Sequence, residues 1–242
     1  MIASIWISPL AWASIFMLLF LTLFNVYHVL HLVPNDKVCG LHGMAWTPVD
    51  QGLNYEWQMF PWLTLFTKSD YFGDPVEDAD KNWQEFLPES PIAIPKSRLR
   101  DLKPTPDSNL LHPPRDETRV LALPEVFVEL GCINLLRQHL NRQRYNITYS
   151  DKPAFQGPYE DIMYRADLCL NRLREAAMCW GDMSSILQNL TRVPGHPIPD
   201  SALDYATRHK CRDFEAVARW TENNAVKAVR MRDMWWGGRV FY

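Results

Sequence analysis

The first 35 residues of this chain contain no aspartate, glutamate, lysine or arginine. Within them the segment PLAWASIFMLLFLTLFNVYHVLHL, from Pro9 to Leu32, is almost entirely apolar. A helix crosses the hydrocarbon core of a bilayer, roughly 30 Å thick, with about 20 predominantly apolar residues. The sequence therefore predicts a single transmembrane anchor over residues 1–32, followed by a body that folds outside the hydrocarbon layer.

A cleaved signal peptide is the alternative interpretation, but its apolar stretch usually spans only about 7 to 15 residues behind a basic start. Here the apolar run is longer, and no lysine or arginine precedes it. Asp36 and Lys37 follow the run and cancel, so loop charge does not set the orientation. Two glycosylation sequons, at Asn146 and Asn189, and five cysteines predict a body in the lumen of the secretory pathway, where thiols oxidise.

Composition divides the remaining chain in two. Residues 33–124 hold 12 of the 18 prolines together with four tryptophans, so long helices are excluded there, yet the aromatic content is too high for a solvated linker. We expect an arm rich in proline and aromatic residues that packs over the body, with one short helix within residues 75–90 and an exposed loop over 103–117. The net charge of −3 offers no basic face for nucleic acid, which we exclude as a partner.

Residues 125–242 show helical periodicity, which predicts a mainly α fold with a helical body. A first helix is expected over Glu125–Arg144, and a second begins at Pro158, since proline favours the first helical turn. A third is expected over Ala202–Val229, with Phe214, Val217 and Ala225 on its inner face. The expected inward stripe of the first helix is Val126, Leu130, Ile133, Leu136 or Arg137, and Leu140. That of the second is Ile162, Ala166, Cys169, Leu173, Ala176 or Ala177, and Trp180.

The first two predicted helices carry the same short motif. GCINLLRQ at Gly131–Gln138 and LCLNRLRE at Leu168–Glu175 share Cys-[Ile/Leu]-Asn-x-Leu-Arg-[Gln/Glu], 37 residues apart. Each copy places its cysteine and leucine on one face and its arginine about one turn later, as two helices packed as a pair would require.

Three segments in this order resemble the fungal UstYa-like family, membrane-anchored proteins of mycotoxin and ribosomal-peptide biosynthesis. They are VFVELGCINLLRQ, YRADLCLNRLREAAMCWGD and HKCRDFEAVARW, behind an N-terminal span and a proline-rich and tryptophan-rich arm. In that family the first two motifs each begin with His-x-x-His-Cys. Two histidines three residues apart lie on the same side of a helix, so two facing helices would present four imidazoles to one or two metal ions. The resemblance implies copper-dependent oxidases that hydroxylate, desaturate or close rings on peptide side chains with dioxygen.

This chain departs from the family pattern at those histidines. Aligned on the cysteines, the four positions are Val128, Gly131, Arg165 and Leu168. None supplies a neutral imidazole nitrogen, and Arg165 would place a permanent positive charge beside any cation. We therefore predict that the metal site implied by the resemblance is absent and that copper is doubtful as a cofactor.

The family cysteines are retained as Cys132, Cys169, Cys179 and Cys211. A thiolate that served only as a metal ligand would lose its use with the histidines, so their presence favours disulfides that tie the helices together. Four cysteines allow three pairings, and the sequence does not choose among them. Cys39, just after the predicted span, is the expected unpaired residue.

Two further residues lie in segments that match the family, Asp182 after MCWG and His209 in the third motif. Both are candidate catalytic residues of a pocket, and solvated positions at helix ends are the alternative. His28 and His31 have the spacing of metal ligands, but polar ring tips at a membrane interface are a sufficient explanation for them.

A basic run, Arg208, Lys210 and Arg212, is suited to an acidic peptide. The alternative is a solvated helix face that Asp213 and Glu215 partly neutralise.

Two functions stay open from the sequence. In the first, the protein is an oxidoreductase or oxidative cyclase of fungal secondary metabolism that acts on a peptide or small natural product. In the second, it is a non-catalytic partner or scaffold that forms a hetero-oligomer with an active UstYa-like protein. The resemblance favours the first, and the four missing histidines favour the second.

Overall fold

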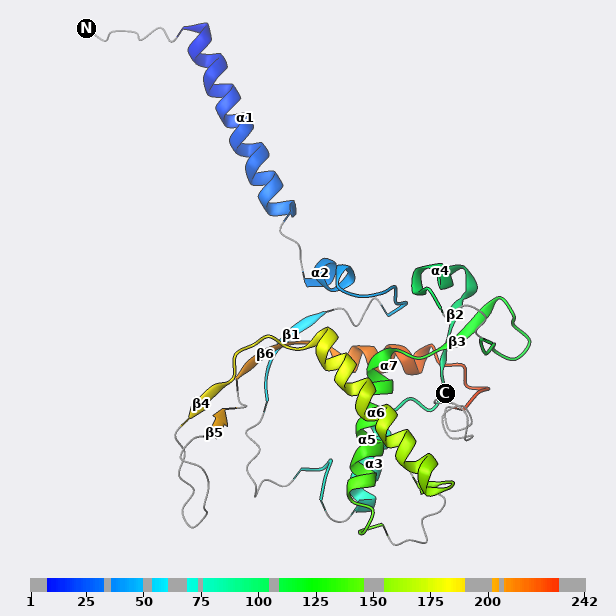
Figure 1. Cartoon of the computed structure of the whole chain (residues 1–242). Coiled ribbons are helices and arrows are strands. Elements are labelled where there is room, and N and C mark those ends of the chain that lie inside the picture. The colour runs from blue at the N-terminus through cyan, green and yellow to red at the C-terminus, as the bar shows by residue number, and fades with distance from the viewer. Residues whose placement is uncertain are drawn as a thin grey trace. The chain divides into compact units, whose positions relative to one another are not determined.

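The structure is a computed structural model of the whole chain, drawn in Figure 1. It describes residues 8–32, 36–49, 54–60, 69–73, 76–104, 109–145, 155–189, 202–204 and 207–230. Contacts divide the chain into two units, Met1–Met44 and Ala45–Tyr242. The second unit therefore joins most of the expected arm to the expected helical body.

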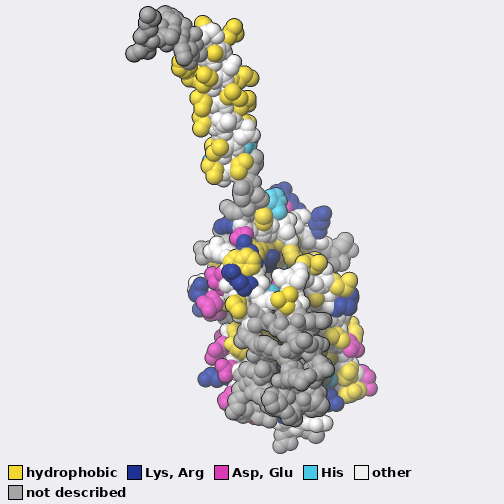
Figure 2. Space-filling model, turned by 90° about the vertical axis from the view of Figure 1, so that its left-hand side faces the viewer, with side chains coloured by type: hydrophobic (Ala, Val, Ile, Leu, Met, Phe, Trp, Pro, Cys, Tyr) yellow, Lys and Arg dark blue, Asp and Glu magenta, His cyan; other side chains and the backbone are white. Residues whose placement is uncertain are grey.

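The N-terminal unit contains helix α1, Pro9–Leu32, and the short helix α2, Asp36–His42. Figure 2 shows hydrophobic side chains along the length of α1, and nearly all of them are exposed. Its polar side chains bond back to the helix: Ser14 Oγ donates to the carbonyl of Leu10 at 2.9 Å, and Asn25 Nδ2 to that of Leu21 at 2.7 Å. Residues Pro9–His31 are long and apolar enough to cross a membrane, a criterion that a signal sequence or the core helix of a soluble protein also meets.

The centre of the second unit is a pair of long helices, α5 over Glu125–Leu140 and α6 over Tyr159–Trp180. α6 begins behind Gly157, whose φ of 92° suits glycine, and Pro158 caps it, as the sequence predicted. Glu160 and Asp161 in its first turn favour the positive end of the helix dipole. A disulfide joins Cys132 of α5 to Cys169 of α6.

The expected arm contributes its own elements to this unit. Helix α3, Val76–Phe86, lies where the short helix was predicted, and it contacts α5. Strands β2, Ile92–Pro95, and β3, Arg119–Ala122, form an antiparallel pair that places Ile92 opposite Ala122. A 3-10 turn, η2 over Lys96–Arg98, and the short helix α4, Leu99–Leu102, follow β2.

A second apolar cluster forms around this hairpin. Ile92, Ile94 and Val120 are at most 3% exposed, and Trp46 and Trp220 pack against them. Since Trp46 lies near the start of the unit and Trp220 near its end, the proline-rich region carries part of the hydrophobic core.

The remaining elements are strands and one helix. β1, Tyr55–Met59, pairs antiparallel with β6, Arg208–Arg212, and β4, Leu187–Asn189, pairs with β5, Ala202–Asp204. Helix α7 covers Phe214–Asn223. The described part of the chain is thus mainly α, as predicted, with three two-stranded sheets that the sequence analysis did not foresee.

The prediction of one helix over Ala202–Val229 was wrong. Residues 208–212 are a strand, and α7 starts only at Phe214, because Asp213 Oδ1 accepts the backbone N–H of Ala216 at 2.9 Å and caps the helix there. Ala225 lies beyond the helix, where it forms a single bridge with Ile92. The spacing of apolar residues, on which the prediction was based, indicates neither this cap nor the pairing of β6 with β1.

The inward stripe predicted for α5 was wrong in part: Arg137 is buried and Leu136 packs against the disulfide cluster, but two other members face solvent. Ile133 is 40% exposed and Leu140 is 81% exposed, and the helix ends at Leu140 rather than Arg144. The buried residues of α5 are Phe127, Gly131, Cys132, Leu135, Arg137 and Gln138. The stripe predicted for α6 holds at Ala166 and Cys169, which are buried, but its last member, Trp180, is 48% exposed.

Candidate functional site

The four positions expected from the histidine motifs lie on the α5–α6 pair, where the disulfide brings the Cα atoms of Cys132 and Cys169 to 4.9 Å. Gly131 is buried, and Val128, Arg165 and Leu168 are partly buried. The space between the helices is filled by apolar side chains: Leu135, Ala166, Leu136, Phe155 and Leu173 surround the disulfide. This part of the pair is a packed core.

Arg165 takes part in local structure rather than in a ligand set. Its Nη2 donates to the carbonyl of Gln156 in the segment before α6, and its Nε is buried without a partner among the described residues.

Besides the disulfide, an ion pair joins α5 to α6, since Arg172 Nε donates to Glu125 Oε1 at 2.7 Å. Burial, and then the nearby charge of Glu125, raise the pKa of Glu129.

The repeated motif makes the same local bond twice. In α5, Arg137 Nε and Nη2 donate to Asn134 Oδ1 at 3.0 and 2.9 Å. In α6, Arg174 Nε and Nη2 donate to Asn171 Oδ1 at 3.2 and 2.9 Å. The shared Asn-x-x-Arg therefore orients each guanidinium along its own helix, in line with contacts between positions i and i+3.

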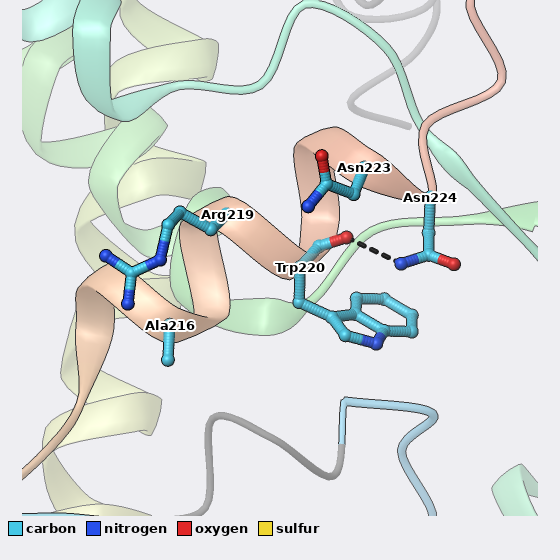
Figure 3. A pocket seen from close by; sticks show the side chains of 5 residues that line it. All are labelled: Ala216, Arg219, Trp220, Asn223 and Asn224. Atoms are coloured by element: carbon cyan, nitrogen blue, oxygen red, sulfur yellow. Dashed lines mark hydrogen bonds between the residues drawn. The ribbon is translucent and has the colours of Figure 1, made fainter.

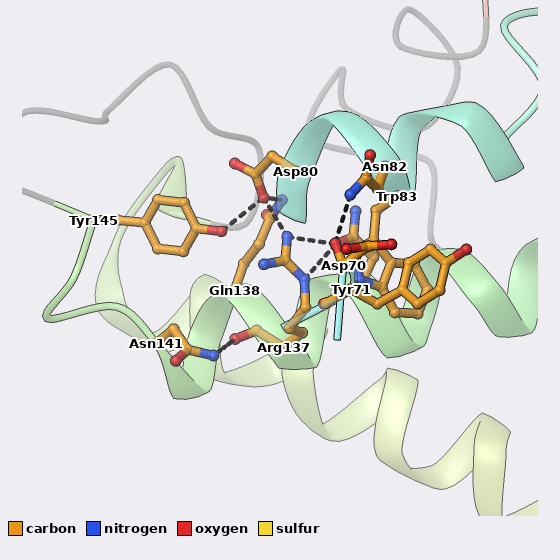
Figure 4. Close-up of polar contacts among 10 residues, drawn as sticks. Asp70, Tyr71, Asp80, Asn82, Trp83, Arg137, Gln138, Asn141 and Tyr145 are labelled. Carbon is orange, nitrogen blue, oxygen red and sulfur yellow. Dashed lines mark hydrogen bonds and ion pairs between the residues drawn. The ribbon is translucent and has the colours of Figure 1, made fainter. Parts of the chain in front are cut away.

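Only the first copy turns its arginine into the protein. Arg137 is 9% exposed and forms an ion pair with Asp80 of α3, which is 5% exposed (Figure 4). Asp80 Oδ1 also accepts from Tyr145 Oη at 2.7 Å and from Gln138 Nε2 at 3.3 Å. Burial, and then the hydrogen bond to Asp80, raise the pKa of Tyr145.

This buried network was not predicted from the sequence. The sequence shows the arginine of the repeat and Asp80 in a predicted short helix of the arm, but no local pattern links two residues that lie so far apart in the chain. Because three donors converge on Oδ1 of Asp80, the network fixes α3 against α5.

The two candidate residues, Asp182 and His209, lie together. His209 Nδ1 is 2.6 Å from Asp182 Oδ2, although 27 residues separate them. β6 supplies His209, which is 7% exposed, and the segment after α6 supplies Asp182, whose side chain is 54% exposed. The alternative of two solvated helix-end residues is wrong for His209, which is buried in a strand.

Asp182 is held as a carboxylate acceptor. The backbone N–H of Ser184 donates to its Oδ1 at 2.7 Å. Hydrogen bonds from Ser184, and then from His209, lower the pKa of Asp182 to about 2. It is therefore ionised at neutral pH.

Two residues that the sequence analysis missed complete this site. Thr207 Oγ1 lies 3.2 Å from His209 Nε2. The ring of Phe60 stacks on the imidazole at a centroid distance of 4.4 Å and an interplanar angle of 16°. Alternation along a strand would have placed Thr207, His209 and Cys211 on one face, had residues 208–212 been recognised as a strand.

The opposite face of the β1–β6 pair is basic and aromatic. Register places Tyr55 opposite Arg212 and Trp57 opposite Lys210. The guanidinium of Arg208 lies 4.8 Å from the ring centroid of Trp57, and the ammonium of Lys210 lies 5.7 Å from it. Arg212 lies over Tyr55 at 6.0 Å and over Trp180 of α6 at 5.5 Å. These distances suit cation–π contact.

The predicted neutralising acids serve other purposes. Asp213 caps α7, and Glu215 forms an ion pair with Arg219 at 3.2 Å. The basic run is therefore a strand face, not the helix face that was the alternative.

A pocket of about 440 Å³ lies along α7 (Figure 3). It is lined by Ala216, Arg219, Trp220, Asn223 and Asn224. None of these side chains is an acid, a thiol or an imidazole. At the Asp182–His209 pair, by contrast, a carboxylate and the Thr207 hydroxyl both lie within hydrogen-bonding distance of the imidazole.

Comparison with known proteins identifies the chain. The profile of the family described as "Mycotoxin biosynthesis protein UstYa" matches residues 3–224. This chain belongs to the UstYa family. It is 26% identical over 221 residues to the UstYa family oxidase phomYc of Diaporthe leptostromiformis, covering 88% of this chain and 84% of that protein. No solved structure matches.

Two other relatives extend the comparison. The chain is 36% identical over 108 residues to the oxidase ustYa of Aspergillus flavus, covering 45% of this chain and 44% of that protein. It is 27% identical over 171 residues to the transacylase cctO of Talaromyces islandicus, covering 67% of this chain and 55% of that protein. These relatives support a role in secondary-metabolite biosynthesis.

The residues present do not fit the copper site that UstYa family resemblance implies. Where the motifs would place imidazoles, the structure has a valine, a buried glycine, an arginine bonded to a carbonyl, and a leucine. The neighbouring sulfurs are joined in the disulfide and offer no thiolate. In the part of the chain that the structure describes, no three histidine, cysteine or acidic side chains are grouped to hold a metal ion.

The predicted cysteine pairs are resolved only in part. Cys132 and Cys169 are bonded, whereas Cys179, Cys211 and Cys39 are free. The expectation of a bridge at Cys179 and Cys211 is not met. Burial, and then the charge of Asp182, raise the pKa of Cys211.

The remaining predicted sites are the histidine pair of α1 and the two glycosylation sequons. The rings of His28 and His31 contact Phe24 and Tyr27 within α1. Asn146 lies outside the described residues, and Asn189 ends β4 without a described side chain. Glycosylation at both stays a prediction.

Proposed function

We propose that this UstYa family chain is a membrane-anchored protein of fungal secondary-metabolite biosynthesis, of the oxidase or oxidative-cyclase type, that acts on a mycotoxin or peptide natural product. The observation that carries the proposal is the family match over residues 3–224, which includes the apolar helix α1 and both copies of the repeated motif. Relatives named as UstYa family oxidases support the reaction type.

The anchor follows from the physics of α1. Its 24 residues span about 36 Å at 1.5 Å per residue, which exceeds the roughly 30 Å of a bilayer core. Leu10, Phe16 and Leu30 are each at least 65% exposed, so water would contact a continuous apolar surface along the helix. Burial of that surface in lipid is favourable at about 25 cal/mol per Å². The body then lies in the lumen, which suits the Cys132–Cys169 disulfide.

We place the reactive group of the proposed enzyme at His209. Asp182 accepts from Nδ1, which leaves the lone pair of Nε2 beside the Thr207 hydroxyl, where it can also remove a proton from a substrate O–H, N–H or activated C–H that takes the place of that hydroxyl. Phe60 shields one face of the ring and fixes its plane. The proposal gives this chain the proton-removal part of an oxidation and routes no step through copper at the helix pair.

The basic and aromatic face of β1–β6 supports binding of the substrate. Arg208, Lys210 and Arg212 recur at every second residue, about 7 Å apart, on the face opposite to His209. An extended acidic peptide repeats its side chains at the same interval, and the exposed ring of Trp57 adds an apolar contact. We propose that this face holds carboxylate groups in a part of the peptide or peptide-like substrate that lies away from the atoms that react at His209.

A second function has its own support. Because the motif positions are apolar, buried or occupied by arginine, the chain also suits a non-catalytic partner that forms a hetero-oligomer with an active UstYa family member. Restoring histidine tests this reading: Val128→His, Gly131→His, Arg165→His and Leu168→His together should give a chain that binds no copper, since the disulfide cluster already fills the space between the helices. Copper binding with oxidase activity in that variant would show an open catalytic pocket instead.

Deletion and complementation in the producing fungus test the proposed function. Deletion should abolish a secondary metabolite and accumulate a precursor that differs from it by an oxidative change, detected by mass spectrometry. The wild-type gene should restore the metabolite. An unchanged metabolite profile in the deletion strain would overturn the proposed role.

Complementation with variants separates the two functions. An enzyme that uses His209 should lose the product with His209→Gln at normal protein level, whereas a non-catalytic partner should retain it. Glu215→Gln, which alters an exposed ion pair outside the site, is the matched control and should restore the product fully. Loss of product in both variants would point to folding or assembly rather than to the site.

A further inference from the structure

Three side chains of the candidate site form a continuous line of hydrogen bonds. Thr207 Oγ1 is 3.2 Å from His209 Nε2, and His209 Nδ1 is 2.6 Å from Asp182 Oδ2. A hydroxyl, an imidazole and a carboxylate in this order are the arrangement in which a hydroxyl is activated as a nucleophile. We infer that Thr207 is an acyl-accepting nucleophile and that this chain transfers acyl groups, an activity beyond the oxidative role proposed above.

The positions of the protons follow from the acceptors. Asp182 is a carboxylate and can only accept, so Nδ1 of His209 carries the proton of that bond. In the neutral imidazole, Nε2 then has the lone pair and accepts from the hydroxyl of Thr207. The hydroxyl proton therefore already points at the base that would remove it.

The line is fixed before any substrate binds. The backbone N–H of Ser184 holds Asp182 through the other carboxylate oxygen, with 2.7 Å between N and Oδ1. Phe60 stacks on His209 and restricts rotation of the ring. His209 is 7% exposed, whereas Thr207 is partly exposed, so a substrate reaches the relay at its hydroxyl end. Such preorganisation lowers the cost of reaching the reactive geometry.

A competing nucleophile lies on the same strand face. Cys211 follows His209 by two residues and is partly buried. Burial and the charge of Asp182 raise the pKa of its thiol, so it stays protonated and poorly nucleophilic at neutral pH. The Thr207 hydroxyl, in contrast, lies within hydrogen-bonding distance of the imidazole. Geometry and charge both favour the hydroxyl.

The reaction balances without an oxidant or a metal ion. Thr207 Oγ1 attacks the carbonyl carbon of an acyl donor R–CO–X, its proton passes to His209 Nε2, and the C–X bond breaks as that proton moves to X. An acceptor H–Y then attacks the carbonyl carbon of the Thr207 ester and gives its proton to Nε2. The bond between that carbon and Thr207 Oγ1 breaks, Nε2 passes the proton to Oγ1, and R–CO–Y leaves. The acyl donor is an ester, thioester or activated amide, and the acceptor is an amine or a hydroxyl. Asp182 acts as a positioning residue that orients the imidazole and stabilises its protonated form.

The test uses the full-length protein in detergent micelles with p-nitrophenyl acetate as the acyl donor. We expect release of p-nitrophenolate and, after an acid quench, an acetyl group on the peptide that contains Thr207, found by mass spectrometry. An added primary amine should become N-acetylated and should remove that acetyl group from the protein.

Variants assign the roles of the three residues. Thr207→Val preserves shape and should abolish the acetyl-peptide, with release slowed roughly 10²-fold or more, whereas Thr207→Ser should retain it. His209→Gln should slow release roughly 10²- to 10⁴-fold. Asp182→Asn should also slow the release of p-nitrophenolate. Asp182→Glu should recover part of that rate, which a merely structural role of Asp182 would not explain.

Two control variants test whether the effect is specific to the Thr207 hydroxyl. Thr118→Val removes a hydroxyl that also donates to an aspartate, Asp116, at 2.6 Å, but without an imidazole, and it should change nothing. Cys211→Ala should also leave the acetyl-peptide in place. Acetyl found only on lysines or on Cys211, or unchanged release in Thr207→Val, would overturn the inference.

The outcome is separable from that of the proposed function. Acyl transfer is measured on the purified protein as acetylation of Thr207, whereas the oxidative role is measured from the metabolites of the deletion and complemented strains, so the two results are obtained independently. A fungus that loses its product with His209→Gln but a protein that never acetylates Thr207 would keep the proposed function and reject acyl transfer. Acetylation of Thr207, together with an unchanged metabolite profile in the deletion strain, would keep acyl transfer and reject the proposed function.

Discussion

Removal of the Asp80 carboxylate is expected to destabilise the second unit more than any change to its surface ion pairs. In Asp80→Ala, the guanidinium of Arg137 stays buried at 9% exposure without its ion-pair partner, and Tyr145 and Gln138 lose their acceptor. Breaking a buried ion pair from one side costs about 3–5 kcal/mol of unfolding free energy. Each lost bond is a hydrogen bond to a charged group, worth roughly 1.5–3 kcal/mol, so the bonds from Arg137, Tyr145 and Gln138 together make a loss of this size or larger plausible.

Chemical denaturation of the full-length protein in detergent, followed by tryptophan fluorescence, measures this loss. Trp83 reports on the site because Arg137 lies 6.0 Å from its ring centroid. For a domain of this size, 3–5 kcal/mol corresponds to a fall of roughly 6–20 °C in Tm. Asp80→Asn, which keeps an oxygen acceptor, should cost less than Asp80→Ala.

A matched surface change supplies the control. Glu215 and Arg219 form an exposed pair at positions i and i+4, with side chains 86% and 65% exposed, so Glu215→Ala should cost about 0.5 kcal/mol or less. The double variant Asp80→Ala with Arg137→Ala should cost less than the sum of the single changes, by roughly 2–3 kcal/mol. A loss below about 1 kcal/mol in Asp80→Ala, with an unchanged denaturant slope, would refute the claim that this buried pair holds α3 against α5.

Three further outcomes are expected. Cys132→Ser with Cys169→Ser opens a loop set by a separation of 37 residues and should cost about 4 kcal/mol, and thiol titration of the unreduced, denatured protein should find the three remaining cysteines free. The pKa of Asp182 is lowered to about 2 in the folded state, so its contribution to stability is present above about pH 4 and is lost as pH falls toward 2; the difference between wild type and Asp182→Asn in denaturation midpoint should shrink over that range, and a constant difference would contradict the bond to His209. An N-glycosidase should shift the gel mobility of the wild type, and Asn146→Gln with Asn189→Gln should abolish the shift, whereas an unshifted wild type would oppose a lumenal body.

Local sequence signals sufficed for the long helices. α1 was predictable because a charge-free apolar run of this length has one stable form in lipid, a helix that satisfies its own backbone. The start of α6 was predictable from Pro158, and the pairing of α5 with α6 from the repeated motif, because both signals act within a few turns of the chain. α3 was located by its helical residues between flanking prolines.

Patterns failed where a distant partner decides the outcome. The inner face of α5 was predicted from apolar residues, but Asp80 draws Arg137 and Gln138 inward, and Ile133 is left exposed. The segment Arg208–Arg212 was predicted as helix, but it pairs with β1, which lies some 150 residues earlier in the chain. Neither partner is visible within a window of sequence.

The sequence by itself determined the apolar helix, the paired long helices, the UstYa resemblance and the loss of the four motif histidines, since each depends on residue type and short spacing. Only the tertiary structure decided which cysteines bond, which arginine of the repeat is buried, and that Asp182 and His209 meet beside Thr207. The physical reason is the range of the interactions. Helix formation and membrane burial are properties of a segment, whereas a hydrogen bond of 2.6 Å between residues 27 positions apart exists only after the β1–β6 strands and the end of α6 have packed.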